Sequence, residues 1–270
     1  MRRSEHNYEF GMYNIHIYAY DNDGNRSYVP LNPHNIINTH PGNGWTYING
    51  QKYFYDKKGQ MIGNMPAKKV VDVSTYNGRV DWDTAKTYGG IDGAILRITS
   101  HKDGYYMEDA QFANNLAACR RLQIPFGIYI YDYANNNGDA VNEANIVLNI
   151  LRKYNIQPNE LQYPVYYDLE RTKDANGEWL SPARYEGFVG SFISTMNNNG
   201  YVAHVYSYRS LLQNNLNSSY IWSYTSWMAA YTSSMGWSNP YYKGWLGWQY
   251  TSSEYVPGIG TCDVSCWFKV

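Results

Sequence analysis

The sequence of 270 residues lacks several features that mark common protein classes. It contains no run of about 18 consecutive apolar residues, so no membrane span is predicted. Charged residues make up only 17% of the chain and the formal net charge is −1. No basic field therefore exists that would attract nucleic acid. No spacing typical of a metal site, such as H-E-x-x-H, occurs, and we expect neither a metal nor an organic cofactor.

Cysteine is scarce as well, with only Cys119, Cys262 and Cys266. An odd number gives no disulfide framework, although Cys262 and Cys266 are close enough in sequence to pair. Cys119 falls in a helical pattern and is predicted to be a buried, unreactive thiol. No apolar segment follows the charged N-terminal residues, so no export signal is evident. Action outside the cell would then need a trimmed signal or a phage-type release.

Aromatic residues are abundant, at 17% of the chain, with 30 Tyr and 9 Trp. Tyr and Trp combine a flat apolar face with one hydrogen-bonding tip, which suits the faces and hydroxyl rims of sugar rings. A tyrosine-rich core and surface would give the same composition. Hydrophobic residues make up 44% of the chain, which is enough for a sizeable core.

The first part of the chain predicts a small all-β hairpin region. Residues 1–41 are polar, and the alternation over residues 13–20 indicates a strand. Residues 42–64 contain two alternating aromatic segments around Asn49-Gly50, which is a strong hairpin signal. Residues 65–69 are predicted to be a linker.

Both N-terminal segments resemble known repeats. Residues 42–64 resemble a single cell-wall-binding repeat of the choline-binding type, and residues 1–41 resemble the tail of a Bsp-like repeat. The resemblance implies contact with choline or wall teichoic acid through residues 44–61. Such repeats form ligand sites between neighbouring copies, so a single copy favours the alternative of a structural spacer.

From residue 70 onward, apolar strand segments alternate with amphipathic helical stripes. The clearest stripe runs from Tyr185 to Met196, with Ser181-Pro182 as its N-terminal cap. After Leu216 the spacing shortens and no stripe appears. Residues 70–270 are therefore predicted to form an α/β, TIM-like (β/α)5(β)3 barrel. The eight strand segments are 70–73, 94–98, 126–131, 165–169, 202–206, 227–231, 246–250 and 264–268.

Four acidic residues stand at the ends of these strands. Asp72 ends the first strand, Asp168 and Glu170 end the fourth, and Asp263 begins or precedes the last. Functional residues of such barrels lie at the C-terminal ends of strands. Glycosidic cleavage needs a proton donor and a stabilising charge, and clustered carboxyl groups separate their own pKa values. A D-x-E pair alone also occurs by chance, as a solvated strand end or a helix cap.

Five ordered motifs then make the sequence recognisable. They are Val71–Gly78 with Val80-Asp81-Trp82, Tyr167–Glu170, Trp227–Tyr231, Trp248–Ser252, and Val256–Ile259 with Asp263–Ser265. Together they resemble the glycoside hydrolase family 25 lysozymes, the Chalaropsis-type muramidases. The resemblance implies cleavage of the β-1,4 bond between N-acetylmuramic acid and N-acetylglucosamine in peptidoglycan, at the cell wall or outside the cell.

The resemblance also implies roles for individual residues. Glu170 would be the general acid, and Asp168 the partner that stabilises the transition state or orients the acetamido group. Asp72 and Asp263 would hold the acid network and the sugar. The residues implied to line the glycan groove are Arg97, Tyr129, Tyr131, Tyr167, Trp227, Tyr231, Trp248 and Gln249.

The second strand departs from the family pattern. Arg97–His101 replaces the usual K-A-T-E-G, so the acid is absent and Ser100 stands near its place. His101 and His204 are isolated in sequence and are predicted to be satisfied surface or core residues. Two alternatives to an active muramidase follow from these departures: a wall-binding protein with impaired catalysis, or a barrel glycosidase acting on another N-acetylated glycan.

Overall fold

A computed structural model describes residues 16–20, 26–30, 44–48, 50–63, 65–102 and 104–270. The chain divides into two compact units, Met1–Ala67 and Lys68–Val270. This division falls inside the segment predicted as a linker. Within the described ranges, no helix is both long and apolar enough to cross a membrane.

The first unit contains two antiparallel strand pairs. Strands β1 (His16–Tyr20) and β2 (Arg26–Pro30) form one pair. Strands β3 (Gly44–Ile48) and β4 (Gln51–Tyr55) form the other, which confirms the predicted hairpin. The remaining parts of the segment 1–41, and Asn49 of the predicted turn, lie outside the described residues.

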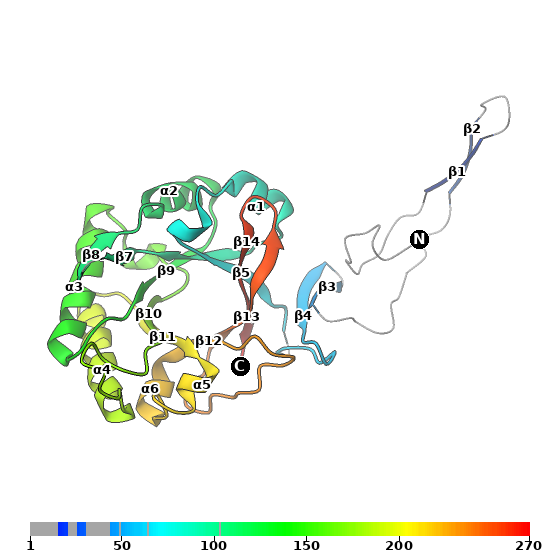
Figure 1. The fold of residues 1–270 in the computed structure, drawn as a ribbon. Helices are drawn as coiled ribbons and strands as arrows, with labels where there is room; N and C mark the ends of the chain where they lie inside the picture. The colour runs from blue at the N-terminus through cyan, green and yellow to red at the C-terminus, as the bar shows by residue number, and fades with distance from the viewer. Residues whose placement is uncertain (1–15, 21–25, 31–43, 49, 64, 103) are drawn as a thin grey trace. The chain divides into compact units, whose positions relative to one another are not determined.

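The second unit is a closed barrel of eight strands (Figure 1). Seven strands run parallel, and the last is antiparallel to both of its neighbours, β13 and β5. The barrel strands are β5 (Lys68–Val73), β6 (Gly93–Arg97), β9 (Phe126–Tyr131), β10 (Val165–Leu169), β11 (Ala203–Tyr208), β12 (Thr225–Ala229), β13 (Trp245–Val256) and β14 (Gly260–Lys269).

Helices follow the first five barrel strands and pack around the outside (Figure 1). In α4 the predicted apolar stripe is buried, and the Ser181 hydroxyl accepts a hydrogen bond from the Arg184 backbone N–H. This arrangement confirms the (β/α)5(β)3 architecture. The helices are α1 (Trp82–Tyr88), α2 (Phe112–Leu122), α3 (Asn137–Lys153), α4 (Pro182–Asn198), α5 (Arg209–Leu212) and α6 (Ser219–Tyr224), with 3-10 turns η2 (Thr75–Asn77) and η3 (Pro158–Glu160).

Two elements were not predicted from the sequence. Helix α6 lies in the region where no stripe was found, because a six-residue helix is too short to show one. A hairpin of β7 (Thr99–Lys102) and β8 (Tyr105–Glu108) is inserted between β6 and α2. Its four-residue strands are too short to stand out by alternation. The hairpin begins where β6 ends, which is the end of the barrel where function is expected.

Large aromatic side chains fill the barrel interior. The rings of Tyr166 and Trp227 lie edge to face with their centres 5.0 Å apart, and the ring centres of Trp227 and Trp267 are 5.7 Å apart. Gly247 makes room for them, since a Cβ atom there would lie 2.5 Å from the Trp267 ring. Part of the aromatic content therefore belongs to the core, in agreement with the alternative explanation of the composition, a tyrosine-rich core and surface.

All three cysteines are buried and free. Cys262 and Cys266 both lie on β14, four residues apart in extended backbone. That spacing separates their Cα atoms by about 13 Å, whereas a disulfide needs less than about 7 Å. The pairing that the sequence left open is therefore absent.

Candidate active site

The four predicted acids come together at one end of the barrel. Asp72 lies on β5, Asp168 on β10, Glu170 just beyond β10, and Asp263 on β14. Because β14 runs antiparallel, its beginning meets the C-terminal ends of the other strands, and Asp263 pairs directly with Asp72 in the ladder. All four side chains line a pocket of about 580 Å³. The structure thus brings together residues that are up to 191 positions apart in sequence (263 − 72).

Burial changes the protonation of this cluster. It raises the pKa of Glu170 to about 7, with the charge of Asp263 acting in the same direction. Hydrogen bonds to Asp168 and Tyr208 oppose this shift. Burial also raises the pKa of Asp263 to about 6. Glu170 can therefore hold a proton near neutral pH, which an ordinary glutamic acid does not.

Asp72 and Asp168 are more deeply buried, with 7% and 4% of their surface exposed. Burial is the largest cause that raises the pKa of each, and neighbouring carboxylates add to it. Like charges at such short range resist joint ionisation. Simultaneous ionisation of all four carboxyl groups is therefore disfavoured. The Oδ1 atom of Asp168 is buried and has no hydrogen-bond partner among the described residues.

Gln249 connects the acids to two tyrosines. Its Nε2 donates to Asp72 Oδ2 at 2.9 Å. Its Oε1 accepts from the hydroxyls of Tyr206 at 2.8 Å and Tyr231 at 2.7 Å. The two O–H donors fix which end of the amide faces Asp72. Gln249 therefore supplies a hydrogen bond that favours the ionised form of Asp72 and partly offsets its burial.

Arg97, the basic residue predicted to line the groove, already pairs with an acid outside the cluster. Its Nε and Nη2 atoms both lie 2.7 Å from Asp109 Oδ2, and its guanidinium sits 4.8 Å from the Tyr76 ring centre. In the described part of the chain, no ion pair includes any of the four acids. The repulsion among the four carboxylates is therefore reduced by protonation, because no basic side chain of the described residues pairs with them. Nor do the described residues include a group of three or more His, Cys, Asp or Glu arranged to hold a metal ion.

Two predicted groove residues lie elsewhere. Tyr167 is fully buried and stacks on Phe192 at 4.1 Å, and its hydroxyl donates to Asp132 at 2.8 Å and Glu143 at 2.5 Å. It points away from the pocket because strand alternation places it opposite Asp168. Trp248 is 1% exposed and donates to the Ala230 carbonyl, while its neighbour Gln249 faces the pocket. The other predicted groove residues, Arg97, Tyr129, Tyr131, Trp227, Tyr231 and Gln249, do line it.

Several lining residues escaped the sequence analysis. Tyr206 and Tyr208 alternate into the pocket from β11, a signal that was present in the strand pattern. His101, predicted to be a satisfied histidine, also lines the pocket, because the unpredicted hairpin carries it there. The lining residues not predicted include Ser74, Tyr76, Asn77, Thr99, Ser100, His101, Tyr106, Tyr133, Tyr206, Tyr208, Ser252, Thr261 and Cys262.

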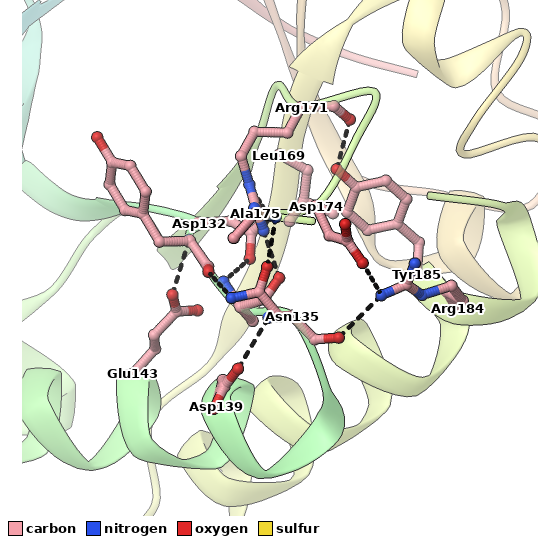
Figure 2. Close-up of polar contacts among 12 residues, drawn as sticks. Asp132, Asn135, Asp139, Glu143, Leu169, Arg171, Asp174, Ala175, Arg184 and Tyr185 are labelled. Carbon is pink, nitrogen blue, oxygen red and sulfur yellow. Dashed lines mark hydrogen bonds and ion pairs between the residues drawn. The ribbon is translucent and has the colours of Figure 1, made fainter. Parts of the chain in front are cut away.

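Hydrogen bonds and ion pairs join the loops that follow β9 and β10 (Figure 2). Arg171, the residue after Glu170, donates to Asp132 Oδ2 from Nη2 at 3.0 Å and to the Ala134 carbonyl. The Tyr185 hydroxyl donates to the Arg171 carbonyl at 2.6 Å.

A second set of bonds joins the same loops. Arg184 Nη2 donates to the Asn135 carbonyl and to Asp174, and the Ala175 N–H donates to Asn135 Oδ1 (Figure 2). These contacts hold the backbone that follows Glu170 in one position, as a proton donor requires.

A (β/α) barrel with a proton-holding carboxyl cluster at its C-terminal end is the arrangement of a glycoside hydrolase. The model of glycosyl hydrolases family 25 matches residues 71–259, and the chain belongs to this family. The match confirms the resemblance drawn from the motifs. No curated protein sequence matches the chain.

Solved structures of similar fold agree with this family assignment. The modular autolysin LytC from Streptococcus pneumoniae is 37% identical with a TM-score of 0.76, over 93% of this chain and 56% of the autolysin. The chain thus spans a little over half the length of that protein. The spore cortex lytic enzyme SleM from Clostridium perfringens (19% identity, TM-score 0.62, covering 74% of this chain and 67% of SleM) shares the fold. So does a lysozyme from Streptomyces coelicolor (18% identity, TM-score 0.57, covering 73% and 90%).

Proposed function

We propose that this chain is a peptidoglycan hydrolase that cleaves the β-1,4 bond between N-acetylmuramic acid and N-acetylglucosamine. The observation that carries the proposal is the cluster of four carboxyl groups in one pocket, in which the pKa of Glu170 rises to about 7. A second structure of LytC, 36% identical to this chain, is of a complex with a synthetic peptidoglycan ligand. That relative supports a wall glycan as the substrate.

In the proposed mechanism Glu170 donates its proton to the glycosidic oxygen as the bond to the sugar breaks. Positive charge then develops at the anomeric centre, and the remaining negative charge of the cluster stabilises it. A water molecule supplies the oxygen that finally binds the anomeric carbon, and its proton returns to the carboxyl cluster. The unpartnered Oδ1 of Asp168 would accept a hydrogen bond from the acetamido N–H of the substrate. Such a bond would satisfy a buried acceptor and orient the sugar at once.

Asp72 and Asp263 would hold the acid network and contact the sugar. Their ladder pairing fixes their separation, and Gln249 fixes the orientation of Asp72. Tyr129, Tyr131, Trp227 and Tyr231 line the same pocket and would contact the glycan. We infer that the enzyme acts at the bacterial cell wall, outside the cell or after phage-type release, where such a substrate is found.

The Glu170→Gln variant tests this function. It removes the proton donor but keeps the side-chain volume, so release of reducing ends from purified peptidoglycan should fall by at least about 100-fold. Glu178→Gln is the matched control, since that side chain is 73% exposed and lies outside the pocket lining. Mass spectrometry of the products separates muramidase from glucosaminidase action. Retention of full activity by Glu170→Gln would remove Glu170 from the proposed role.

A wall-binding protein with impaired catalysis is the second candidate, motivated by the altered second strand. It predicts that wild-type chain sediments with cell walls and releases no reducing ends. The third candidate, action on another N-acetylated glycan, predicts cleavage of chitin oligosaccharides in preference to peptidoglycan.

The hairpin of β3 and β4 is proposed to serve as a spacer. The Lys52 ammonium lies 5.8 Å from the Trp45 ring centre and 5.9 Å from that of Tyr47. A choline group would need the same position over these rings. Binding of choline or wall teichoic acid through residues 44–61 would therefore require displacement of Lys52, and calorimetric titration of the chain with choline tests it directly.

A further inference from the structure

The hairpin of β7 and β8 places aromatic rings along one side of the pocket. His101 and Tyr133 stack face to face, with ring centres 4.0 Å apart and planes at 17°. Tyr106 meets both rings by its edge, at 5.0 Å and 6.0 Å. Tyr131 lies 4.9 Å from Tyr133. All four rings line the same pocket as the acids.

These rings lead away from the acid cluster. Tyr131 is the member beside the acids, since it pairs with Asp168 in the ladder between β9 and β10. Tyr133 and His101 follow in order of ring contact. Tyr133 keeps 38% of its surface exposed and lines the pocket. The rings therefore form a continuous aromatic path from the site of bond cleavage to the hairpin.

A buried acid holds the hairpin in place. Glu143 of α3 is 1% exposed and accepts a hydrogen bond from the Tyr106 hydroxyl. It also accepts from the Tyr133 backbone N–H at 2.8 Å and from the Tyr167 hydroxyl at 2.5 Å. One carboxyl thus joins the hairpin, the loop after β9 and the strand that carries Asp168. A surface so fixed is preorganised, which lowers the entropic cost of binding.

We propose that His101, Tyr106 and Tyr133 form a further sugar-binding subsite, which takes an uncharged N-acetylated pyranose ring of the glycan some way from the scissile bond. Flat apolar rings with hydroxyl tips match the C–H face and hydroxyl rim of such a sugar. The three side chains offer aromatic faces and no carboxylate or amine, which favours a sugar ring over a charged peptide. The proposal rests on the proposed function for the direction of the glycan through the pocket.

The test uses peptide-free oligosaccharides of alternating N-acetylmuramic acid and N-acetylglucosamine, a disaccharide and an octasaccharide. Binding is measured by calorimetry on the Glu170→Gln chain, which does not consume the ligand. Tyr133→Ala and His101→Ala are introduced separately into that chain. Tyr105→Ala is the matched control. Tyr105 lies directly before Tyr106 on β8, is 74% exposed and is outside the pocket lining.

Loss of one aromatic contact should weaken octasaccharide binding between about twofold and tenfold. Disaccharide binding should stay within the error of the control, since one sugar on each side of the scissile bond leaves the rings of the hairpin uncontacted. Thermal unfolding shows whether Tyr133→Ala stays folded, and His101→Ala carries the test if it does not.

Three results with the variants would overturn the subsite. They are an equal change for both oligosaccharides, no change for either, and a change seen only when peptide stems are attached to the glycan. Absence of octasaccharide binding to the Glu170→Gln chain would also overturn it. Failure of the proposed function looks different, because the wild-type chain would then release no reducing ends, whatever the hairpin variants do to binding.

Discussion

Replacing Asp263 with Asn tests the electrostatic link within the acid cluster. Burial, followed by the Asp263 charge, raises the pKa of Glu170 from its ordinary value of 4.5 to about 7. A general acid must hold its proton, so the rate of cleavage should fall as pH rises through about 7. Without the charge of Asp263, the ionised form of Glu170 becomes less costly and its pKa falls. The alkaline decline should therefore move to lower pH.

The size of this shift follows from the environment of the two groups. Glu170 and Asp263 both keep part of their surface exposed, so solvent screens their interaction in part. Two unit charges about 4 Å apart interact by about 1 kcal/mol in bulk water and more strongly where water is partly excluded. One pKa unit corresponds to about 1.4 kcal/mol, so the expected displacement is at least about 0.7 pH unit.

The assay is reducing-end release from the octasaccharide, with kcat/KM measured between about pH 4 and about pH 9. Asp83→Asn is the matched control, since Asp83 pairs with Arg121 on the surface and lies outside the acid pocket. If Asp263→Asn is too slow to assay, ¹³C NMR of the Glu170 carboxyl follows the same pKa. An alkaline decline that stays in place or moves upward in Asp263→Asn would refute the coupling, and with it the reason given for the proton on Glu170.

Three further substitutions probe the scaffold. Gly258→Ala should lower the free energy of unfolding by more than about 2 kcal/mol, because Gly258 has φ +83° and a Cβ atom would lie 2.3 Å from the Asp81 carbonyl; an unchanged urea midpoint would contradict this. Arg171→Met should lower the free energy of unfolding by about 3–5 kcal/mol, measured by urea denaturation, since it leaves Asp132 buried without its ion-pair partner. A decrease below about 1 kcal/mol would show that this ion pair does not hold the loops together. Gln249→Leu should destabilise the fold by about 1–3 kcal/mol per unsatisfied group, because two tyrosine hydroxyls and one carboxylate lose their partner; chemical denaturation that matches the wild type would show that these groups find other partners.

Much of the barrel was predictable because its strands and helices bury regular faces. The stripe of α4 and its Ser181 cap follow from local spacing, and local spacing survives into the structure. The hairpin of β7 and β8 was not predictable, since its short strands bury little and are held by a side-chain contact to α3. Helix α6 is hidden for the same reason of length.

The prediction of groove residues shows a different limit. Asp168 and Glu170 alternate with Tyr167 along one strand, so the sequence already implied that Tyr167 faces away from them. A family motif contains aromatic residues of both strand faces, and only one face lines the pocket. Trp248 and Gln249 are adjacent on β13, so in the same way only Gln249 faces the pocket.

The sequence by itself determined the family, the barrel and the identity of the four acids, because strand periodicity and ordered motifs are local properties of the chain. Only the tertiary structure decided how strongly each acid is buried and which aromatic rings line the pocket. Those properties depend on burial and on contacts between strands far apart in sequence: the antiparallel return of β14 sets Asp263 beside Asp72, and the closed barrel buries Asp72.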